Sequence, residues 1–318
     1  MTRVSYVFWN NNEQRLRAPW RLILFLLLVA AIANPLILLL DATDNRFLET
    51  TFENVFVALG FVLALAVSAR FFEHHPLKQY GLSLQRLWFG ELGIGFALGG
   101  AIMALVLTPQ YFAGWILVED TLQTTIPATP FVLAFAGQIL RYFGGSFFEE
   151  LFSRSYLLRL TAETIRGSRI QREGAVLIAA AATAFLFGLL HMFNPGASLV
   201  SVVNLTMLGL LFALPMIVTG RLALSIGLHM GWNVFQSMVC GLHNSGIPSN
   251  TSLLVIQLAG PTIWTGGSFG PEGGLVAFLV ILIAFIFVAA WLQIGNHTLR
   301  TDGSLADPPT RESSVFHQ

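Results

Sequence analysis

Long apolar runs separated by short polar connections dominate this chain. Several runs reach the roughly 18 to 20 residues that one helical crossing of a bilayer core needs. The pattern therefore predicts an all-α fold, a polytopic membrane bundle of about eight transmembrane helices. The predicted spans cover residues 20–40, 52–70, 88–109, 130–158, 175–193, 199–220, 222–240 and 274–294.

The spans predict one membrane domain with short flanking segments. We expect residues 1–14 to be an N-terminal cytoplasmic segment and residues 15–296 to be the membrane domain. Residues 297–318 contain too few apolar side chains to bury, which predicts a disordered cytoplasmic tail.

Basic residues collect in alternate connections, which predicts the orientation. The remaining connections carry acidic residues, with Arg46 as the only basic one. Because cytoplasmic loops are enriched in Lys and Arg, both termini are predicted to be cytoplasmic and the Gly-, Ser-, Pro- and Thr-rich segment 241–273 to be an external loop. The basic residues are Arg15, Arg17, Arg21, Arg70, Lys78, Arg86, Arg159, Arg166, Arg169 and Arg172, and the acidic ones are Asp41, Asp44, Glu49, Glu119, Asp120 and Glu272.

Composition agrees with a bilayer as the solvent. The chain is 55% hydrophobic and 11% charged, with a mean hydropathy of +0.69. Its formal net charge is zero, which gives no indication of nucleic acid as a partner. Cys240 is the only cysteine, so an intrachain disulfide and a cysteine-based zinc cluster are excluded.

Two adjacent carboxylates and an arginine lie inside the fourth predicted span. A charge at the centre of a membrane helix costs roughly 2.5–3.5 kcal/mol, so these groups must face protein or water. Glu150 and Arg154 are four residues apart and can form a structural ion pair on one helix face. Glu149 points about 100° away and is a candidate general base. Arg141, two turns earlier, is either a further cavity charge or a local structural partner.

Two histidines lie in later spans. Each alone is better explained by a hydrogen bond to a neighbouring helix than by a catalytic role. His229 and Asn233, however, share one helix face and offer two donors suited to the oxyanion of a tetrahedral intermediate. His191 is a candidate to hold a water molecule beside Glu149. Glycines that allow close approach of helix backbones flank both histidines, at Gly188, Gly227 and Gly231.

Other catalytic motifs are absent from the sequence. It contains no His-Glu-x-x-His zinc motif, no Gly-x-Ser-Gly elbow with a paired histidine and no phosphate-binding loop. We therefore predict no cofactor and no metal. A three-ligand zinc site made of Glu149, His191 and His229 remains an alternative that the spacing does not favour.

Three motifs, in this order, resemble the CAAX protease and bacteriocin-processing family, also called CPBP or Abi, which includes the Ras-converting CAAX endopeptidases. The family's Glu-Glu-x-x-x-Arg corresponds to residues 149–154, its Phe-x-x-x-His to residues 187–191, followed by Asn194, and its His-x-x-x-Asn to residues 229–233. The motif-bearing core covers about residues 131–240.

The resemblance implies a metal-independent glutamic protease. In that mechanism Glu149, assisted by His191, activates water, His229 and Asn233 stabilise the oxyanion, and Arg154 holds the second glutamate. Eukaryotic members cut a prenylated protein after the modified cysteine of its CAAX sequence, from the cytoplasmic side. We therefore expect a cytoplasm-facing cavity and a peptide or protein substrate that is prenylated or otherwise anchored in the membrane.

Helix lengths agree only partly with a shared site. At 1.5 Å per residue, Glu149 is about 14 Å from the predicted helix end at Leu158, whereas His191 is about 24 Å from the predicted helix start at Ala175. A fourth helix that continues past Leu158 would remove this difference.

Two other function classes remain open. Relatives of this kind include non-catalytic bacteriocin immunity and scaffold proteins, and intramembrane Glu, Arg and His also build proton-coupled transporters. No inverted repeat is visible in the sequence, which disfavours a transporter. The predominance of Arg over Lys and the short connections favour a multi-pass protein of a bacterial inner membrane.

Overall fold

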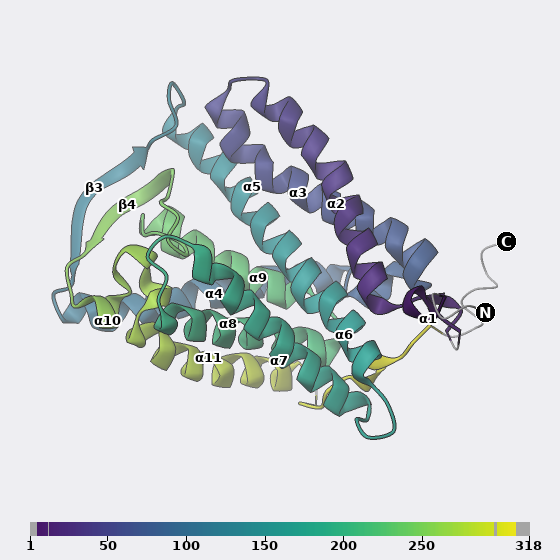
Figure 1. Cartoon of the computed structure of the whole chain (residues 1–318). Coiled ribbons are helices and arrows are strands. Elements are labelled where there is room, and N and C mark those ends of the chain that lie inside the picture. Colours follow the sequence, from purple (N-terminus) through teal and green to yellow (C-terminus); the bar gives the residue numbers. More distant parts are fainter. Residues whose placement is uncertain (1–4, 12, 296–297, 310–318) are drawn as a thin grey trace.

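Apolar helices form an all-α bundle in the computed structural model, as the hydrophobic pattern predicts (Figure 1). The structure describes residues 5–11, 13–295 and 298–309. The long helices are α2 (Ala18–Asp41), α3 (Arg46–Ser68), α4 (Arg86–Phe112), α5 (Phe131–Glu150), α7 (Arg172–Leu190), α8 (Leu199–Thr219) and α11 (Leu275–Ile294). Shorter helices are α1 (Ser5–Phe8), α6 (Leu158–Ile165), α9 (Ala223–Asn233) and α10 (Thr262–Thr265).

Seven of the eight predicted spans are helices long and apolar enough to cross a membrane. The remaining predicted span, at residues 222–240, forms a shorter helix. There, α9 continues as a π-helical segment, Val234–Val239, and nearly every residue of α9 is buried by other helices. This helix lies in the centre of the bundle, which explains why it is apolar without being long.

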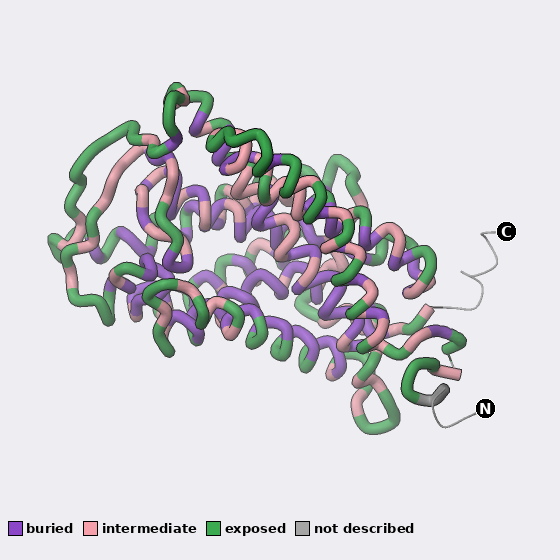
Figure 2. The backbone as a smooth tube through the Cα atoms, turned by 45° about the horizontal axis from the view of Figure 1, so that its top comes forward, coloured by how far each residue is buried: buried purple, intermediate pink, exposed green. Residues whose placement is uncertain are grey.

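The outer surface of the bundle is apolar, as a lipid-facing surface should be. On α11, Leu279 and Ile286 are 52% and 68% exposed, while Ile281 and Ala284 on the opposite face are fully buried. A helix that is apolar on all sides, half of it exposed, is typical of a membrane span. Figure 2 shows exposed positions along the outer faces and buried positions along the inner ones.

Glycines allow α4 and α9 to pack with their backbones nearly touching. A Cβ atom added to Gly99 would overlap the carbonyl oxygen of Leu228, and one added to Gly231 would overlap that of Phe96. Small residues at such positions let membrane helices approach closely and gain van der Waals contact. The close approach predicted at Gly231 is therefore present, and it fixes the helix that carries His229.

A two-stranded antiparallel ribbon lies at one end of the bundle. It pairs β3 (Ile116–Thr124) with β4 (Thr251–Leu258), in a register that joins Ile116 to Leu258 and is interrupted at Glu119. The sequence indicated only loops here, because the ribbon strands come from connections far apart in the chain. The ribbon lies at the end opposite α1 and the segment 298–309 (Figure 1).

Part of the predicted disordered tail is ordered, and the prediction is wrong for residues 298–309. Leu305 and Ala306 are buried in a short 3₁₀ helix, Gly303–Ala306, that packs against α6 and α7. The Asp307 carboxylate accepts a hydrogen bond from Arg166 at 2.7 Å and forms an ion pair with Arg172 at 2.9 Å. Two apolar side chains and one acidic residue are therefore enough to fasten this segment, while residues 296–297 and 310–318 lie outside the described residues.

A buried network of charges closes the same end of the bundle. Arg15 contacts Glu163 at 2.8 Å, and His75 contacts the other oxygen of that carboxylate at 2.8 Å. Glu73 pairs with Arg21 and accepts a hydrogen bond from the Tyr156 hydroxyl at 2.8 Å. These side chains join the N-terminal segment to α2, to α6 and to the π-helical segment Ala69–Glu73 that continues α3.

The glycine contacts generate a stability prediction. Gly99→Ala should lower the stability in detergent by about 1–3 kcal/mol, because the added methyl forces α4 away from α9. Gly93→Ala on the same helix is the matched control, since no atom lies within 4 Å of the position of its Cβ. It should be neutral or stabilising by up to about 1 kcal/mol through helix propensity. Equal melting temperatures for the two variants would contradict the close-packing argument.

Candidate active site

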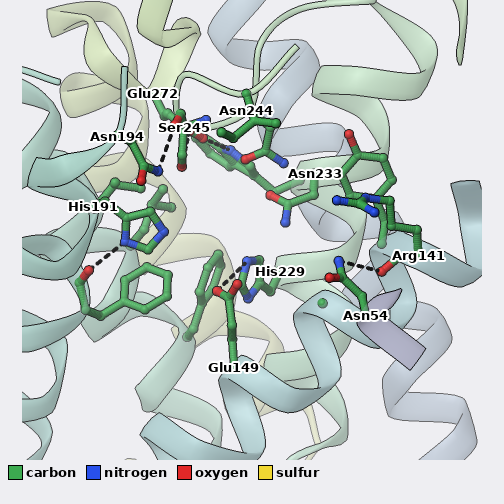
Figure 3. Close-up of a pocket in the computed structure, with 18 of the residues that line it drawn as sticks. Asn54, Arg141, Glu149, His191, Asn194, His229, Asn233, Asn244, Ser245 and Glu272 are labelled. Atoms are coloured by element: carbon green, nitrogen blue, oxygen red, sulfur yellow. Dashed lines mark hydrogen bonds and ion pairs between the residues drawn. The ribbon is translucent and has the colours of Figure 1, made fainter. Parts of the chain in front are cut away.

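A polar cavity of about 200 Å³ lies inside the apolar bundle, between α3, α5, α7, α8 and α9 (Figure 3). Four of the six predicted site residues line it, which are Glu149, His191, His229 and Asn233. The other two, Glu150 and Arg154, lie behind His229 and are fully buried. The chain thus brings all three motifs together around one cavity.

The fourth span is longer than the sequence indicated. Helix α5 continues through a π-helical segment, Leu151–Leu157, into α6, so that one rod runs from Phe131 to Ile165. At 1.5 Å per residue, Glu149 is roughly 24 Å from Ile165 and His191 is roughly 28 Å from Arg172. The apparent difference in depth is removed by a helix that runs past Leu158, as the sequence analysis allowed.

The two glutamates point in different directions from adjacent positions. The side chain of Glu149 is 32% exposed and faces the cavity, whereas that of Glu150 has no exposed surface. Glu150 lies 3.4 Å from Nε of Arg154, one turn along the helix. The ion pair expected from the spacing is therefore present, and Glu149 is left facing the cavity.

His229 links the buried carboxylate to the cavity. Its Nδ1 donates a hydrogen bond to Oε1 of Glu150 at 2.9 Å, and its Nε2 lies 3.8 Å from Oε2 of Glu149. The ring stacks on Phe212 with centroids 5.0 Å apart and meets Phe187 edge-on at 6.0 Å. One hydrogen bond and two aromatic rings fix the imidazole, so that Nε2 is presented to the cavity.

Arg154 is held by aromatic rings as well as by the carboxylate of Glu150. Its guanidinium lies 4.2 Å from the centroid of Phe187 and 5.8 Å from that of Phe212, and its Nε is 3.4 Å from the carbonyl oxygen of Gly209. Among the described residues its two terminal nitrogens have no hydrogen-bond partner. Cation–π contact in a desolvated site compensates part of that loss.

His191 reaches the cavity from the end of α7. A 3₁₀ turn, His191–Phe193, follows the helix, and Nδ1 of His191 donates to the carbonyl oxygen of Phe187 at 2.7 Å (Figure 3). Since Nδ1 carries the proton in this hydrogen bond, Nε2 is the acceptor nitrogen of the neutral ring. Asn194, which follows in the motif, donates to the carbonyl oxygen of Ser245 at 2.9 Å and joins this turn to the loop between α9 and β4.

Glu272 is a site residue that the sequence did not indicate. The sequence indicates only an acidic residue of the predicted external loop, yet Glu272 is 1% exposed and lines the cavity. It accepts hydrogen bonds from Nε1 of Trp232 at 3.1 Å and from the Ser245 hydroxyl at 2.6 Å. Burial raises the pKa of Glu272, while these hydrogen bonds and nearby His191 oppose that rise. The Glu272 carboxylate therefore links Ser245, in the loop after α9, to Trp232, the neighbour of Asn233.

Carboxamides supply much of the remaining polar lining, and no periodic pattern in the sequence indicates them. Arg141 also lines the cavity and forms a 3.0 Å ion pair with Glu53, so both of its proposed roles are observed. The carboxamide residues come from α3, α5, the turn after α7 and the loop before β4, and are Asn54, Gln138, Asn194, Asn244 and Asn250.

The geometry gives no support to the three-ligand zinc alternative. In the described part of the chain, no three His, Cys, Asp or Glu side chains are grouped so that they would hold a metal ion. His229 directs one nitrogen to Glu150, and His191 directs one to a backbone carbonyl.

The cavity lies in the half of the bundle that carries the ribbon. The wall of the cavity on the ribbon side comes from residues within 244–250 and from Glu272, all in the connection between α9 and α11. The basic connections lie at the other end, with α1 and the segment 298–309 (Figure 1). The loop residues that line the cavity therefore belong to the ribbon end and not to the end that carries the basic connections.

An apolar helical bundle around a glutamate, two histidines and an asparagine defines an integral, multi-pass membrane protein with a candidate hydrolytic site. Residues 132–235, about a third of the chain, match the family model described as type II CAAX prenyl endopeptidase Rce1-like. This segment contains all three motifs, and the match confirms the suspected resemblance. At the level of the family it supports a CAAX-protease-like membrane endopeptidase acting on peptides in a lipid environment. No curated protein and no solved structure matches the chain.

The buried ion pair generates a second prediction. Arg154→Met should lower the stability in detergent by about 3–5 kcal/mol, because it leaves the Glu150 carboxylate buried without its cation. The double variant Arg154→Met with Glu150→Gln should recover part of that loss. Arg141→Met is the matched control, since its partner Glu53 is half exposed, and it should cost no more than about 1 kcal/mol. A double variant less stable than Arg154→Met alone would contradict the argument.

Proposed function

We propose that this protein is an intramembrane glutamic endopeptidase that hydrolyses peptide bonds without a metal ion. One observation carries the proposal. The exposed carboxylate of Glu149 shares a single cavity with His191, and Nε2 of His229 lies 3.8 Å from it. A carboxylate and an acceptor imidazole facing the same small space suit the activation of a water molecule.

The reaction follows from these positions. Glu149, with His191, takes a proton from a water molecule while the oxygen of that water attacks the carbonyl carbon of the substrate. The carbonyl oxygen becomes an oxyanion, to which Asn233 and Nε2 of His229, in the imidazolium form with a proton on each ring nitrogen, would donate hydrogen bonds. Collapse of this intermediate breaks the C–N bond, and the proton held by Glu149 passes to the leaving amine.

Glu150 and Arg154 serve this reaction as positioning residues. The hydrogen bond from Nδ1 of His229 to Glu150 decides which imidazole nitrogen faces the substrate. Arg154 keeps Glu150 in place from the other side. Neither residue lines the cavity, so their contribution to catalysis passes through His229.

The substrate we propose is a peptide or protein segment near the membrane surface, and the location a bacterial inner membrane with both termini cytoplasmic. The exposed apolar faces of the helices support a lipid environment. The placement of Arg and Lys in alternate connections supports the orientation.

Cleavage by purified protein tests the proposal. Wild-type protein in detergent should cleave members of a fluorogenic panel of prenylated and unprenylated membrane-proximal peptides. Glu149→Gln should lose about 10²–10⁴-fold in rate, as expected when a general base is removed, and His229→Ala should lose a similar factor. Chelator should have no effect.

Glu173→Gln is the matched control, because this glutamate is exposed at the end of the bundle opposite the ribbon and should keep full activity. Melting temperatures of all variants separate loss of catalysis from loss of fold. Cleavage that survives Glu149→Gln would overturn the assignment, and absence of cleavage for every peptide would favour a non-catalytic immunity or scaffold protein.

A further inference from the structure

We infer that the catalytic cavity opens to the non-cytoplasmic side of the membrane and takes an unprenylated, extended peptide segment presented there. The inference rests on the proposed function for its chemistry. Its sidedness rests on separate observations, namely the charges of the connections, the elements that wall the cavity and the side chains that close the opposite end.

The two ends of the bundle differ in positive charge. At the ribbon end, the connections 42–45, 113–130, 194–198 and 240–274 contain no Lys or Arg, and Arg46 at the start of α3 is the only basic residue beside them. The opposite end carries Arg17, Arg70, Lys78, Arg86, Arg169, Arg172 and Arg300, all exposed. Since Lys and Arg are retained on the cytoplasmic side, the ribbon end faces away from the cytoplasm.

Loops at the ribbon end form one wall of the cavity. Asn244, Ser245, Pro248 and Asn250 belong to the connection that leads into β4, and Asn194 belongs to the turn after α7. Ile247, at the rim, is 49% exposed. A peptide would therefore approach through loops that the charge distribution places outside the cytoplasm.

The route from the basic end is filled with packed side chains. Below Glu149 on the same helical rod, Leu151, Arg154 and Leu158 have no exposed surface, and Tyr156 is 1% exposed. Beyond them lies the buried charge network around Glu73 and Glu163. Substrate cannot reach Glu149 from this end without unpacking the charged core.

The lining also indicates what the substrate is. The carboxamides of Asn244 and Asn250 provide donors and acceptors of the kind that pair with the backbone of an extended peptide, whereas the amide nitrogens of Asn54 and Gln138 already donate to the carbonyl oxygens of Arg141 and Thr50. A prenyl chain is hydrocarbon and would leave these groups unpaired.

Cysteine accessibility tests the sidedness without any activity. In a Cys240→Ser background, Ile247→Cys reports the rim, Asn54→Cys the cavity wall and Ser168→Cys the basic end. A membrane-impermeant maleimide should label the first two in sealed right-side-out vesicles, and that labelling should be lost in inverted vesicles. Ser168→Cys should show the reverse pattern. Labelling of Ile247→Cys and Asn54→Cys only in inverted vesicles would overturn the inference.

Cleavage in the same sealed vesicles tests the substrate class. An impermeant, unprenylated fluorogenic peptide should be cleaved by right-side-out vesicles of wild type, with loss of cleavage in inverted vesicles and in Glu149→Gln. Cleavage confined to inverted vesicles, or to prenylated peptides, overturns the inference while leaving the protease intact. If detergent-solubilised protein cleaves nothing, the proposed function fails, and the labelling pattern still decides the sidedness.

Discussion

The buried carboxylate of Glu150 is the group on which the geometry of the cavity depends. It accepts a hydrogen bond from His229 and pairs with Arg154, so it joins the helix of the first motif to the helix of the third. Phe187, from the second motif, packs against both Arg154 and His229. Three short motifs that look independent in sequence are thus parts of one contact network, and Glu149 can face the cavity because its neighbour supplies the structural bonds.

Such a network is stable only where the surrounding helices exclude lipid and water. Glycines at the α4–α9 contact bring α9 against its neighbour with no space between the backbones, and Gly188 does the same between α7 and α8. The consequence is tight packing of the helices that surround the polar cavity. In that setting each hydrogen bond and ion pair orients its partner more strongly than it would in water.

The sequence predicts the bundle and most of the site, because apolar length and charges inside apolar helices are local signals. It predicts the Glu150–Arg154 pair from their spacing and the shared face of His229 and Asn233. It does not predict Glu272, whose role arises from a loop folding back over α9, nor the β3–β4 ribbon, which joins segments more than 120 residues apart. The tail at Leu305 was missed for a similar reason, since two buried side chains leave no periodic pattern.

Chemistry and sidedness are separable properties of this architecture. The motifs place a glutamate, two histidines and an asparagine around a cavity, but the end of the bundle from which that cavity is walled is set by loops outside the motifs. Here those loops carry Asn244, Ser245 and Glu272 and almost no positive charge, while the basic end is sealed by the network around Glu73. A shared catalytic constellation therefore specifies how a bond is cut and leaves the compartment of the substrate to the connections, which is why the placement of Arg and Lys has to be read together with the walls of the cavity.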